Sequence, residues 1–381
     1  NNTAVGNFAL RQNTTGASNV AVGASALLAN TTADSNTAVG MNSLKANTTG
    51  AGNTALGFNS LDANTTAHNN TGIGYNVLSA NTTGATNTAV GSQAMAANIS
   101  GNYNVAVGQL ALDANTTASS NTAVGYASLT VNTTGANNVA VGSNALDANT
   151  TGANNTGLGT NALSANTTAE ANVAVGVNAL MANTTGAYNV AVGVSALDAA
   201  TTAAHNTALG YNTMGATTTG SYCVAVGGAA LSLHTTGADN TAVGYGALRD
   251  LTTGTNNTSL GTYALASLTS TAGNTAIGKA ALGASVTGSY NTALGYLALT
   301  ACLDGGFNVA VGHNAGTAVT SGGSNVLIGS DAGLALTSGS NNLCLGHDAG
   351  ITGSPGGNFT TGSNEIVLGD ENIEAANIQV D

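Results

Sequence analysis

The chain carries very little charge and almost no basic residues. Charged side chains make up 5% of its 381 residues, and the net charge is −12. Only Arg11, Lys45, Arg249 and Lys279 are basic. Proteins that bind nucleic acid neutralise its phosphates with clustered lysine and arginine. Because no such cluster exists here, the sequence excludes nucleic acid as a partner.

Long apolar runs and cysteine motifs are also missing. No stretch approaches the roughly 18–20 continuous apolar residues that span a bilayer, so we expect no membrane insertion. The three cysteines, Cys223, Cys302 and Cys344, are widely separated in the sequence. Their spacings match no metal or redox motif. We therefore expect free, buried thiols and no cofactor.

The residues that enzymes require are not grouped in the sequence. Acid–base catalysis needs paired carboxylates in a cleft, whereas the aspartates recur singly, as at Asp62, Asp113, Asp147 and Asp198. No phosphate-binding loop, dinucleotide motif or catalytic triad stands in a suitable context. These four aspartates are expected on a solvated face, and the sequence predicts no enzyme.

What the chain does contain is a strict 17-residue repeat. The line Asn, Thr or Val, Ala, Val/Leu/Ile, Gly begins at Asn2 and recurs without an insertion to Asn342, which gives 21 copies. We number each repeat from this Asn as position 1; the Gly at position 5 is present in all 21 copies. A short period over a whole chain is typical of a solenoid, in which each repeat stacks on its neighbours.

The residues within one repeat favour β-structure. Positions 2 to 4 are β-prone, as in residues 20–22, and the glycine then ends the run. Positions 8 to 11, as in residues 26–29, are expected to form a second extended piece, and Asn-Thr-Thr-Gly to close the coil. The sequence thus predicts an all-β protein: a parallel β-roll or β-helix solenoid of 17-residue coils.

Alternation along the strands predicts which side chains face inward. Position 4 is always Val, Leu or Ile, and position 9 is Leu or Met in the first 18 repeats. These two positions are expected to form the core ladder, which begins with Val5, Val22, Val39, Leu10, Leu27 and Leu44.

Position 3 is alanine in 16 of 21 repeats. It lies between positions 2 and 4 of the strand, so it is expected to point away from the core. A uniformly small face favours close approach of another backbone. We interpret the stripe as an inter-chain contact, most simply in a homotrimer, and its first members are Ala4, Ala21, Ala38 and Ala55. The alternative is a thin coil in which both faces are internal.

Asparagine occupies position 1 in 20 of 21 repeats. Stacked asparagines can bond to one another along a β-stack, so we expect an Asn ladder that starts with Asn2, Asn19, Asn36 and Asn53. Position 12 is also Asn up to Asn183, and becomes more apolar afterwards. A wider trimer contact or a covered surface would fit that change.

The pattern divides the chain into three parts. Residues 1–307 hold 18 regular coils. Residues 308–363 hold variant repeats with Gly in place of the core Leu, followed by an insertion of five residues that contains Pro355. Residues 364–381 hold a last repeat, expected to begin at Asn364, and a connector to a further module. We expect the sequence to be a piece of a longer protein.

Two polar residue types recur at turn positions and are candidates for recognition. Tyrosine has a flat apolar face and a polar tip, which suits glycan or protein recognition. The receptor-binding candidates at position 6 are Tyr75, Tyr126, Tyr211, Tyr245 and Tyr296. His313 and His347 share that position two coils apart, and rings of three in a trimer could hold an anion or a metal.

The repeated line, as in residues 19–23, resembles the heads of trimeric autotransporter adhesins, which are trimeric parallel β-rolls with a shorter repeat. The whole unit is closer to repeats of phage tail-fibre and tailspike proteins. Residues 363–370, Ser-Asn-Glu-Ile-Val-Leu-Gly-Asp, resemble the segment that precedes an endosialidase-type intramolecular chaperone. This resemblance implies a homotrimeric fibre and carries over no protease residue.

The expected function is that of a non-enzymatic structural fibre for host attachment, extracellular and located on a virion tail or a cell surface. Its expected partners are itself, a host-surface glycan or protein receptor, and other fibre or baseplate proteins. A bacterial trimeric adhesin is the nearest alternative. An ice-binding solenoid is the alternative of another class, although the adjacent Thr14 and Thr15 point to opposite sides.

Overall fold

The computed structural model describes residues 1–351 and 360–370, and within them every regular element is a strand of three residues. Two compact units divide the chain, Asn1–Asn189 and Val190–Asp381. In the described residues, no helix is long and apolar enough to cross a membrane.

The first unit contains the strands β1 (Thr3–Val5), β2 (Val20–Val22), β3 (Thr37–Val39), β4 (Thr54–Leu56), β5 (Thr71–Ile73), β6 (Thr88–Val90), β7 (Val105–Val107), β8 (Thr122–Val124), β9 (Val139–Val141), β10 (Thr156–Leu158) and β11 (Val173–Val175). The second contains β12 (Val190–Val192), β13 (Thr207–Leu209), β14 (Val224–Val226), β15 (Thr241–Val243), β16 (Thr258–Leu260), β17 (Thr275–Ile277), β18 (Thr292–Leu294), β19 (Val309–Val311), β20 (Val326–Ile328), β21 (Leu343–Leu345) and β22 (Ile366–Leu368).

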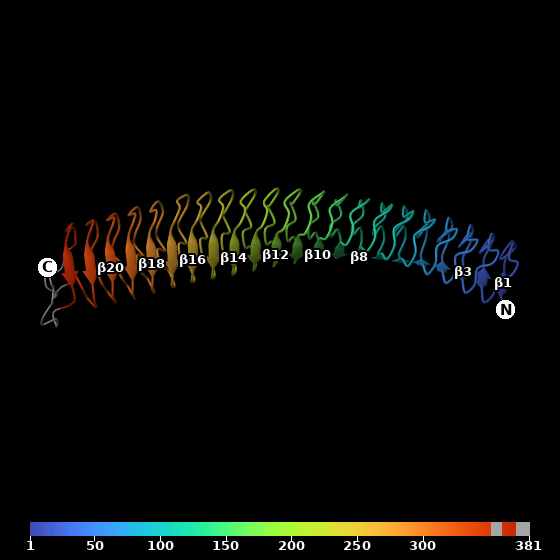
Figure 1. The fold of residues 1–381 in the computed structure, drawn as a ribbon, viewed down its shortest axis with the longest axis horizontal. Coiled ribbons are helices and arrows are strands. Elements are labelled where there is room, and N and C mark those ends of the chain that lie inside the picture. The colour runs from blue at the N-terminus through green and yellow to red at the C-terminus, as the bar shows by residue number, and fades with distance from the viewer. Residues whose placement is uncertain (352–359, 371–381) are drawn as a thin grey trace, which may run out of the picture. The chain divides into compact units, whose positions relative to one another are not determined.

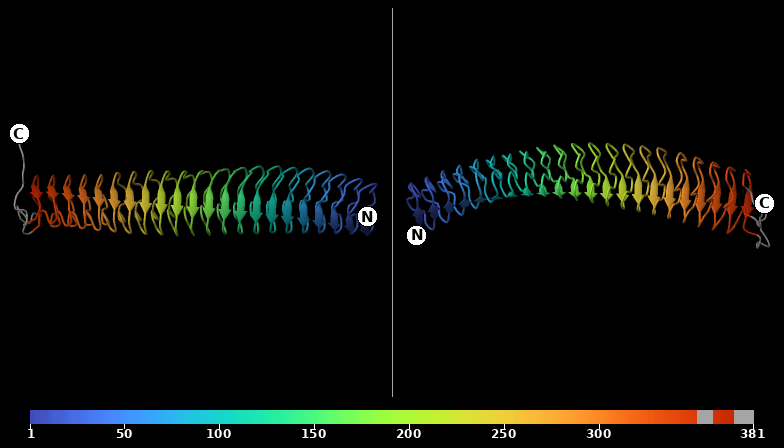
Figure 2. Two further views of the ribbon diagram at one scale, coloured as in Figure 1. Left: turned by 60° about the horizontal axis from the view of Figure 1, so that its bottom comes forward. Right: turned by 180° about the vertical axis from the view of Figure 1, so that it is seen from behind.

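Within each unit, consecutive strands pair in parallel with a shift of one repeat. In the first unit Ala38 lies opposite Ala55, and in the second Ala208 lies opposite Ala225. In each unit the coils stack side by side, with their strands along one side of that unit (Figures 1 and 2). The prediction of an all-β parallel solenoid with 17-residue coils is confirmed.

The prediction of a second extended piece at positions 8 to 11 is wrong. Residues 24–29 form turns instead, and Leu27 has a φ of 49°. Ser25 and Ser35, at positions 7 and 17, also have positive φ, at 59° and 60°. So short a coil must reverse direction sharply, and left-handed residues tighten its turns. Each coil therefore has one strand rather than two.

The glycine at position 5 is required by the close stacking of the coils. Gly23 has a φ of 136°, a value that residues with a side chain rarely adopt. A Cβ atom there would lie 2.5 Å from the carbonyl oxygen of Gly40. Because the same approach recurs from coil to coil, only glycine fits this position.

The strand side predicted to face the core is the opposite of the observed one. From β2 to β22 the middle residue is buried and the two flanking residues are not. Val5 is 59% exposed and Val22 and Val39 are half-buried, so the prediction that they belong to the core ladder is wrong. Leu27 and Leu44 are fully buried, and Leu10 in the first coil is half-buried.

The prediction of an inter-chain alanine stripe is also wrong. Ala21, Ala38 and Ala55 are 0% exposed within the single chain. Ala4 is exposed, and it lies in the first coil. The coil is thin, so its interior accepts a large side chain at position 9 only if the strand opposite presents a small one. Alanine at position 3 provides that space, as the thin-coil alternative requires.

Two polar ladders run inside the coil. At position 1, the backbone N–H of Asn19 donates to Oδ1 of Asn2 at 2.9 Å, and Asn36 and Asn53 continue the series at the same distance. At position 12, Nδ2 of Asn30 donates to Oδ1 of Asn13 at 3.0 Å. These bonds satisfy amide groups that burial would otherwise leave without partners.

In the repeats after Asn183, where position 12 is no longer Asn, its side chain still lies inside the coil. The expectation that its apolar residues cover a trimer contact or another surface is therefore wrong. In the part of the second unit that the structure describes, the nine replacements are 0% exposed: Ala200, Thr217, His234, Leu251, Leu268, Ser285, Cys302, Val319 and Leu336. The polar ladder thus gives way to packing within the same coil.

His234 is the titratable member of this series. Its Nδ1 lies 3.0 Å from Oγ1 of Thr217, whereas its Nε2 has no hydrogen-bond partner in the described structure. Burial lowers the pKa of His234 to about 4, from an ordinary value of 6.5.

His234→Asn should remove an acid sensitivity of the second unit. As the pH falls below about 6.5, the unfolded state takes up a proton before the folded state does, so stability is complete above that pH and is lost toward pH 4. Between pH 7.5 and 4.5 this loss should amount to about 2–3 kcal/mol. Urea unfolding at both pH values measures it. The exposed His68, changed to Asn, is the control, and identical pH profiles for wild type and His234→Asn would contradict the prediction.

The variant repeats, which have Gly at position 9, fill the interior of the coil with an apolar side chain from position 3. A Cβ atom on Gly316 would lie 2.5 Å from Cδ1 of Leu327, and one on Gly333 would lie 2.8 Å from Cδ2 of the same leucine. Leu327 occupies position 3, where most coils have Ala. It fills the space that a leucine at position 9 fills elsewhere.

The last repeat begins one residue later than expected. Strand β22 pairs with β21 so that Ile366 lies opposite Leu343, and the N–H of Glu365 donates to Oδ1 of Asn342 at 3.0 Å. Glu365, not Asn364, therefore occupies position 1, and the insertion is one residue longer than expected. Pro355 and the expected connector after residue 370 lie outside the described residues.

Candidate functional site

A regular surface feature of each unit is the outer face of the sheet. Positions 2 and 4 of each strand point away from the interior, and neither carries a charged residue in any of the 22 strands. Position 2 is Thr in twelve strands and Val, Leu or Ile in the others, and position 4 is always Val, Leu or Ile. Leu56 and Leu158 in the first unit are 46% and 45% exposed. We call these two columns the outer face.

The outer face is large for a surface left in water. Strands about 4.8 Å apart, with two outward residues spanning about 10 Å, give roughly 50 Å² per strand. Eleven strands then present about 500 Å² in each unit, which approaches the upper end of the largest apolar patches on ordinary monomers. Such patches mark surfaces that contact something else.

The five tyrosines at position 6 are exposed on the turn that follows the strand. Tyr75 and Tyr126 belong to the first unit, and Tyr211, Tyr245 and Tyr296 to the second. Their exposures run from 44% for Tyr296 to 67% for Tyr211. The structure thus makes them accessible, and it does not gather them into one enclosed pocket.

Several of these rings stack on an aromatic residue of the neighbouring coil. Tyr75 lies parallel to Phe58 with ring centroids 5.6 Å apart, and Tyr296 lies parallel to His313 at 5.4 Å. Tyr245 meets Tyr263 edge-on at 5.4 Å. Parallel stacking therefore occupies one ring face of Tyr75 and one of Tyr296.

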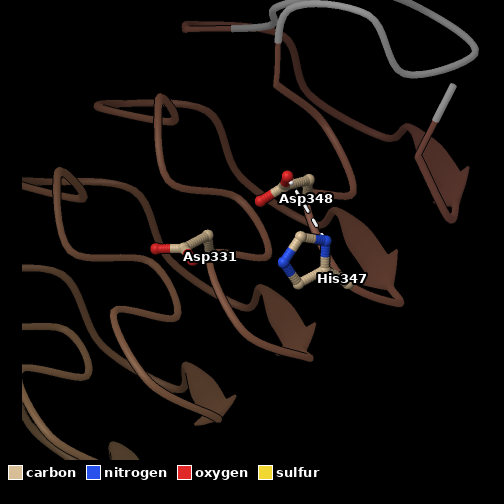
Figure 3. A group of neighbouring side chains, drawn as sticks. All are labelled: Asp331, His347 and Asp348. Carbon is tan, nitrogen blue, oxygen red and sulfur yellow. Dashed lines mark ion pairs between the residues drawn. The ribbon is translucent and has the colours of Figure 1, made fainter.

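An Asp–His group at the end of the second unit was not anticipated from the sequence. Asp331, His347 and Asp348 present one carboxylate or imidazole atom each, and these atoms lie within 4.8 Å of one another. Figure 3 shows them on two neighbouring coils. Nδ1 of His347 lies 3.3 Å from Oδ2 of Asp348 and 3.9 Å from Oδ2 of Asp370 on the next coil.

The carboxylate of Asp331 is held by residues outside this group. Nδ2 of Asn314 donates to its Oδ1 at 3.0 Å, and Oγ of Ser330 donates to its Oδ2 at 2.9 Å. Asp331 and Asp348 both have left-handed backbones, with φ of 58° and 55°. The backbone at position 7 and the hydrogen bonds to Asp331 therefore hold that carboxylate in one orientation.

A signal for this group was present in the sequence. Across the repeats, position 7 carries Asp only at Asp331 and Asp348, and position 6 of the next coil is Asp370. Sequence reasoning paired His313 with His347 because they share a position. The structure instead places His313 against Tyr296 and His347 against Asp348.

A cavity of about 340 Å³ lies near the start of the last strands of the second unit. Glu365 is the only acidic residue among those that line it, so it holds no carboxylate pair of the kind that hydrolyses glycosides. The lining residues are Ser324, Val326, Asn341, Asn342, Leu343, Asn364, Glu365 and Ile366.

The isolated acids and the thiols are less accessible than surface groups. Asp62, Asp113, Asp147 and Asp198 are half-buried rather than fully solvated, and burial raises the pKa of each. The three cysteines are free and buried, as predicted. Burial raises the pKa of Cys302 to about 11 and that of Cys344 to about 12, so both remain protonated thiols.

No protein-family model matches the chain, and no curated protein matches its sequence.

Proposed function

We propose that the chain is the repetitive body of a homotrimeric, non-enzymatic fibre for attachment to a host surface, as in a phage tail fibre. The observation that supports the proposal most is the outer face, which is uncharged in all 22 strands. A bacterial trimeric adhesin has the same requirements for its body. Either protein would work outside the cell, on a virion or on a cell surface.

The outer face replaces the alanine stripe as the surface for trimer contacts. Each unit presents about 500 Å² of it, from the spacing of β-strands, and stable interfaces bury about 800 Å² per partner. A second copy of the chain carries rows of side chains at the same strand spacing, so the side chains of two copies can interdigitate along the outer face of a unit. Few other partners would have both this strand spacing and an uncharged surface.

The exposed tyrosines are the proposed contacts with a glycan or protein receptor. Tyr126 and Tyr211 are 53% and 67% exposed, and exposed tyrosines combine an apolar ring with a hydroxyl group that can hydrogen-bond. Other fibre or baseplate proteins are proposed to bind at the ends of the body. With four basic residues in the chain, nucleic acid is not a proposed partner.

Charging the outer face should dissociate the assembly. The double variant Leu56→Asp, Leu158→Asp places carboxylates on the exposed face of β4 and β10, where a trimer would bury them without partners. Light scattering should give three times the chain mass of 36.5 kDa for the wild type and the mass of one chain for the variant.

A matched variant controls for added charge alone. Thr134→Asp, Thr151→Asp introduces the same two carboxylates at exposed turn positions of the same unit, and it should keep the trimer mass. A monomeric wild type would overturn the homotrimer. A trimer that survives the Leu56→Asp, Leu158→Asp change would show that the outer face is not its contact.

Ice binding remains the second candidate, because the outer face supplies an arrangement that Thr14 and Thr15 do not. Thr and Val or Leu at positions 2 and 4 point from one regular face, with Thr at position 2 in twelve strands. A monomeric wild type that shows thermal hysteresis, lost in the Leu56→Asp, Leu158→Asp variant, would favour this function over the fibre.

A further inference from the structure

The geometry points to a divalent transition-metal site, of the kind that takes Zn²⁺, formed by Asp331, His347 and Asp348. The site would lie at the end of the second unit and would crosslink two neighbouring coils. It is independent of the proposed fibre function.

The donor atoms have the right chemistry and nearly the right separation. Ligand atoms about 2.1 Å from a tetrahedral ion lie about 3.4 Å apart, and the three donor atoms of Asp331, His347 and Asp348 lie within 4.8 Å of one another. Small side-chain rotations would close the remaining distance. Carboxylates alone would suit Ca²⁺ or Mg²⁺, whereas an imidazole among them favours Zn²⁺ or a similar ion.

The charge of the group calls for a cation from outside the chain. Two carboxylates lie with one imidazole in this group, and no lysine or arginine follows Lys279 in the sequence. Among these three side chains, His347 is the only basic one. Like charges at this separation repel one another, and a bound divalent ion would relieve the repulsion.

Groups outside the site already orient one of its ligands. Asn314 and Ser330 each donate a hydrogen bond to a different oxygen of Asp331, which fixes the plane of that carboxylate and leaves further lone pairs for an ion. Such outer contacts tune metal affinity in known sites. The left-handed backbones of Asp331 and Asp348 hold both side chains on one turn surface.

Isothermal titration of the full chain with ZnCl₂ at pH 7.5 tests the site, with CaCl₂ as the comparison ion. We expect one saturable Zn²⁺ per chain and binding at least about tenfold weaker for His347→Gln and for Asp331→Asn. Asn is well tolerated in left-handed conformations, so Asp331→Asn should keep the local fold. Circular dichroism of each variant checks this.

His313→Gln is the matched control, because it removes the histidine at the same repeat position two coils earlier. It should leave Zn²⁺ binding unchanged. The proposal is overturned if the wild type shows no saturable binding, if either His347→Gln or Asp331→Asn binds as the wild type does, or if Ca²⁺ binds as tightly as Zn²⁺.

Discussion

Gly227→Ala should open the coils around β14 and β15. Gly227 has a φ of 122°, and an added Cβ would lie 2.8 Å from both the carbonyl carbon and the oxygen of Gly244. The backbone strain and the clash act together, because neither coil can move without separating the strands stacked on it. We expect a loss of at least about 3 kcal/mol in local stability.

Hydrogen exchange of the backbone amides in β14 and β15 is the measurement, because repeat arrays open locally before they unfold completely. Gly228→Ala is the matched control. Gly228 follows Gly227 directly, has no positive φ, and its added Cβ would come no closer than 3.5 Å to Tyr245. That variant should stay within about 0.5 kcal/mol of wild type. Equal exchange rates in the two variants would refute the close stacking at position 5.

The solenoid itself could be predicted because its signal is global. One short period, held without interruption from Asn2 to Asn342, leaves room only for short strands and turns in each coil. Glycine after a β-prone triplet indicated where each strand ends, and parallel stacking followed from the absence of any insertion. None of these inferences depended on the direction of a particular side chain.

The direction of the side chains could not be read in the same way. A strand of so few residues alternates only once, so Val39 and Ala38 fit either face equally well by pattern. Hydrophobicity favoured the valine as core, yet the volume of the interior decided the outcome. A Cβ atom on Gly72, also at position 3, would lie 3.3 Å from Cδ1 of Leu61, so this position leaves room for little more than a methyl group such as that of Ala38.

The Asp–His group escaped prediction for a different reason. Asp331 and His347 are one residue short of a full repeat apart in the sequence, and their proximity depends on how two turn positions of neighbouring coils sit side by side. An alignment of the repeats places residues at the same position next to each other. It does not show that position 7 of one coil, such as Asp331, lies beside position 6 of the next, such as His347. The same limit concealed Leu327, which compensates for glycines in two different coils.

Asn149→Asp should damage the first unit severely while changing almost no volume. Asn149 is fully buried at position 12, and its Nδ2 donates to Oδ1 of Asn132 at 2.9 Å and to the carbonyl oxygen of Gly152 at 3.0 Å. A carboxylate would face both acceptors with no proton to offer. The carbonyl oxygen of Gly152 keeps a second donor, Nδ2 of Asn138 at 2.9 Å, whereas Oδ1 of Asn132 would lose its donor. One unsatisfied buried acceptor and a buried charge should cost about 3–5 kcal/mol at pH 7.5.

The pH dependence should identify the cause of this loss. Burial raises the pKa of a carboxyl group above its ordinary value, so the folded variant takes up a proton before the unfolded chain does, and its deficit relative to wild type should shrink between pH 7.5 and 4.5. Asn154→Asp makes the same change on an exposed residue of the same unit and should cost little at either pH. Urea unfolding of both variants gives the comparison. If the two deficits are equal, or if that of Asn149→Asp does not depend on pH, then the asparagine ladder contributes packing volume rather than hydrogen bonds, and the apolar residues that replace it in the second unit would be its equivalents.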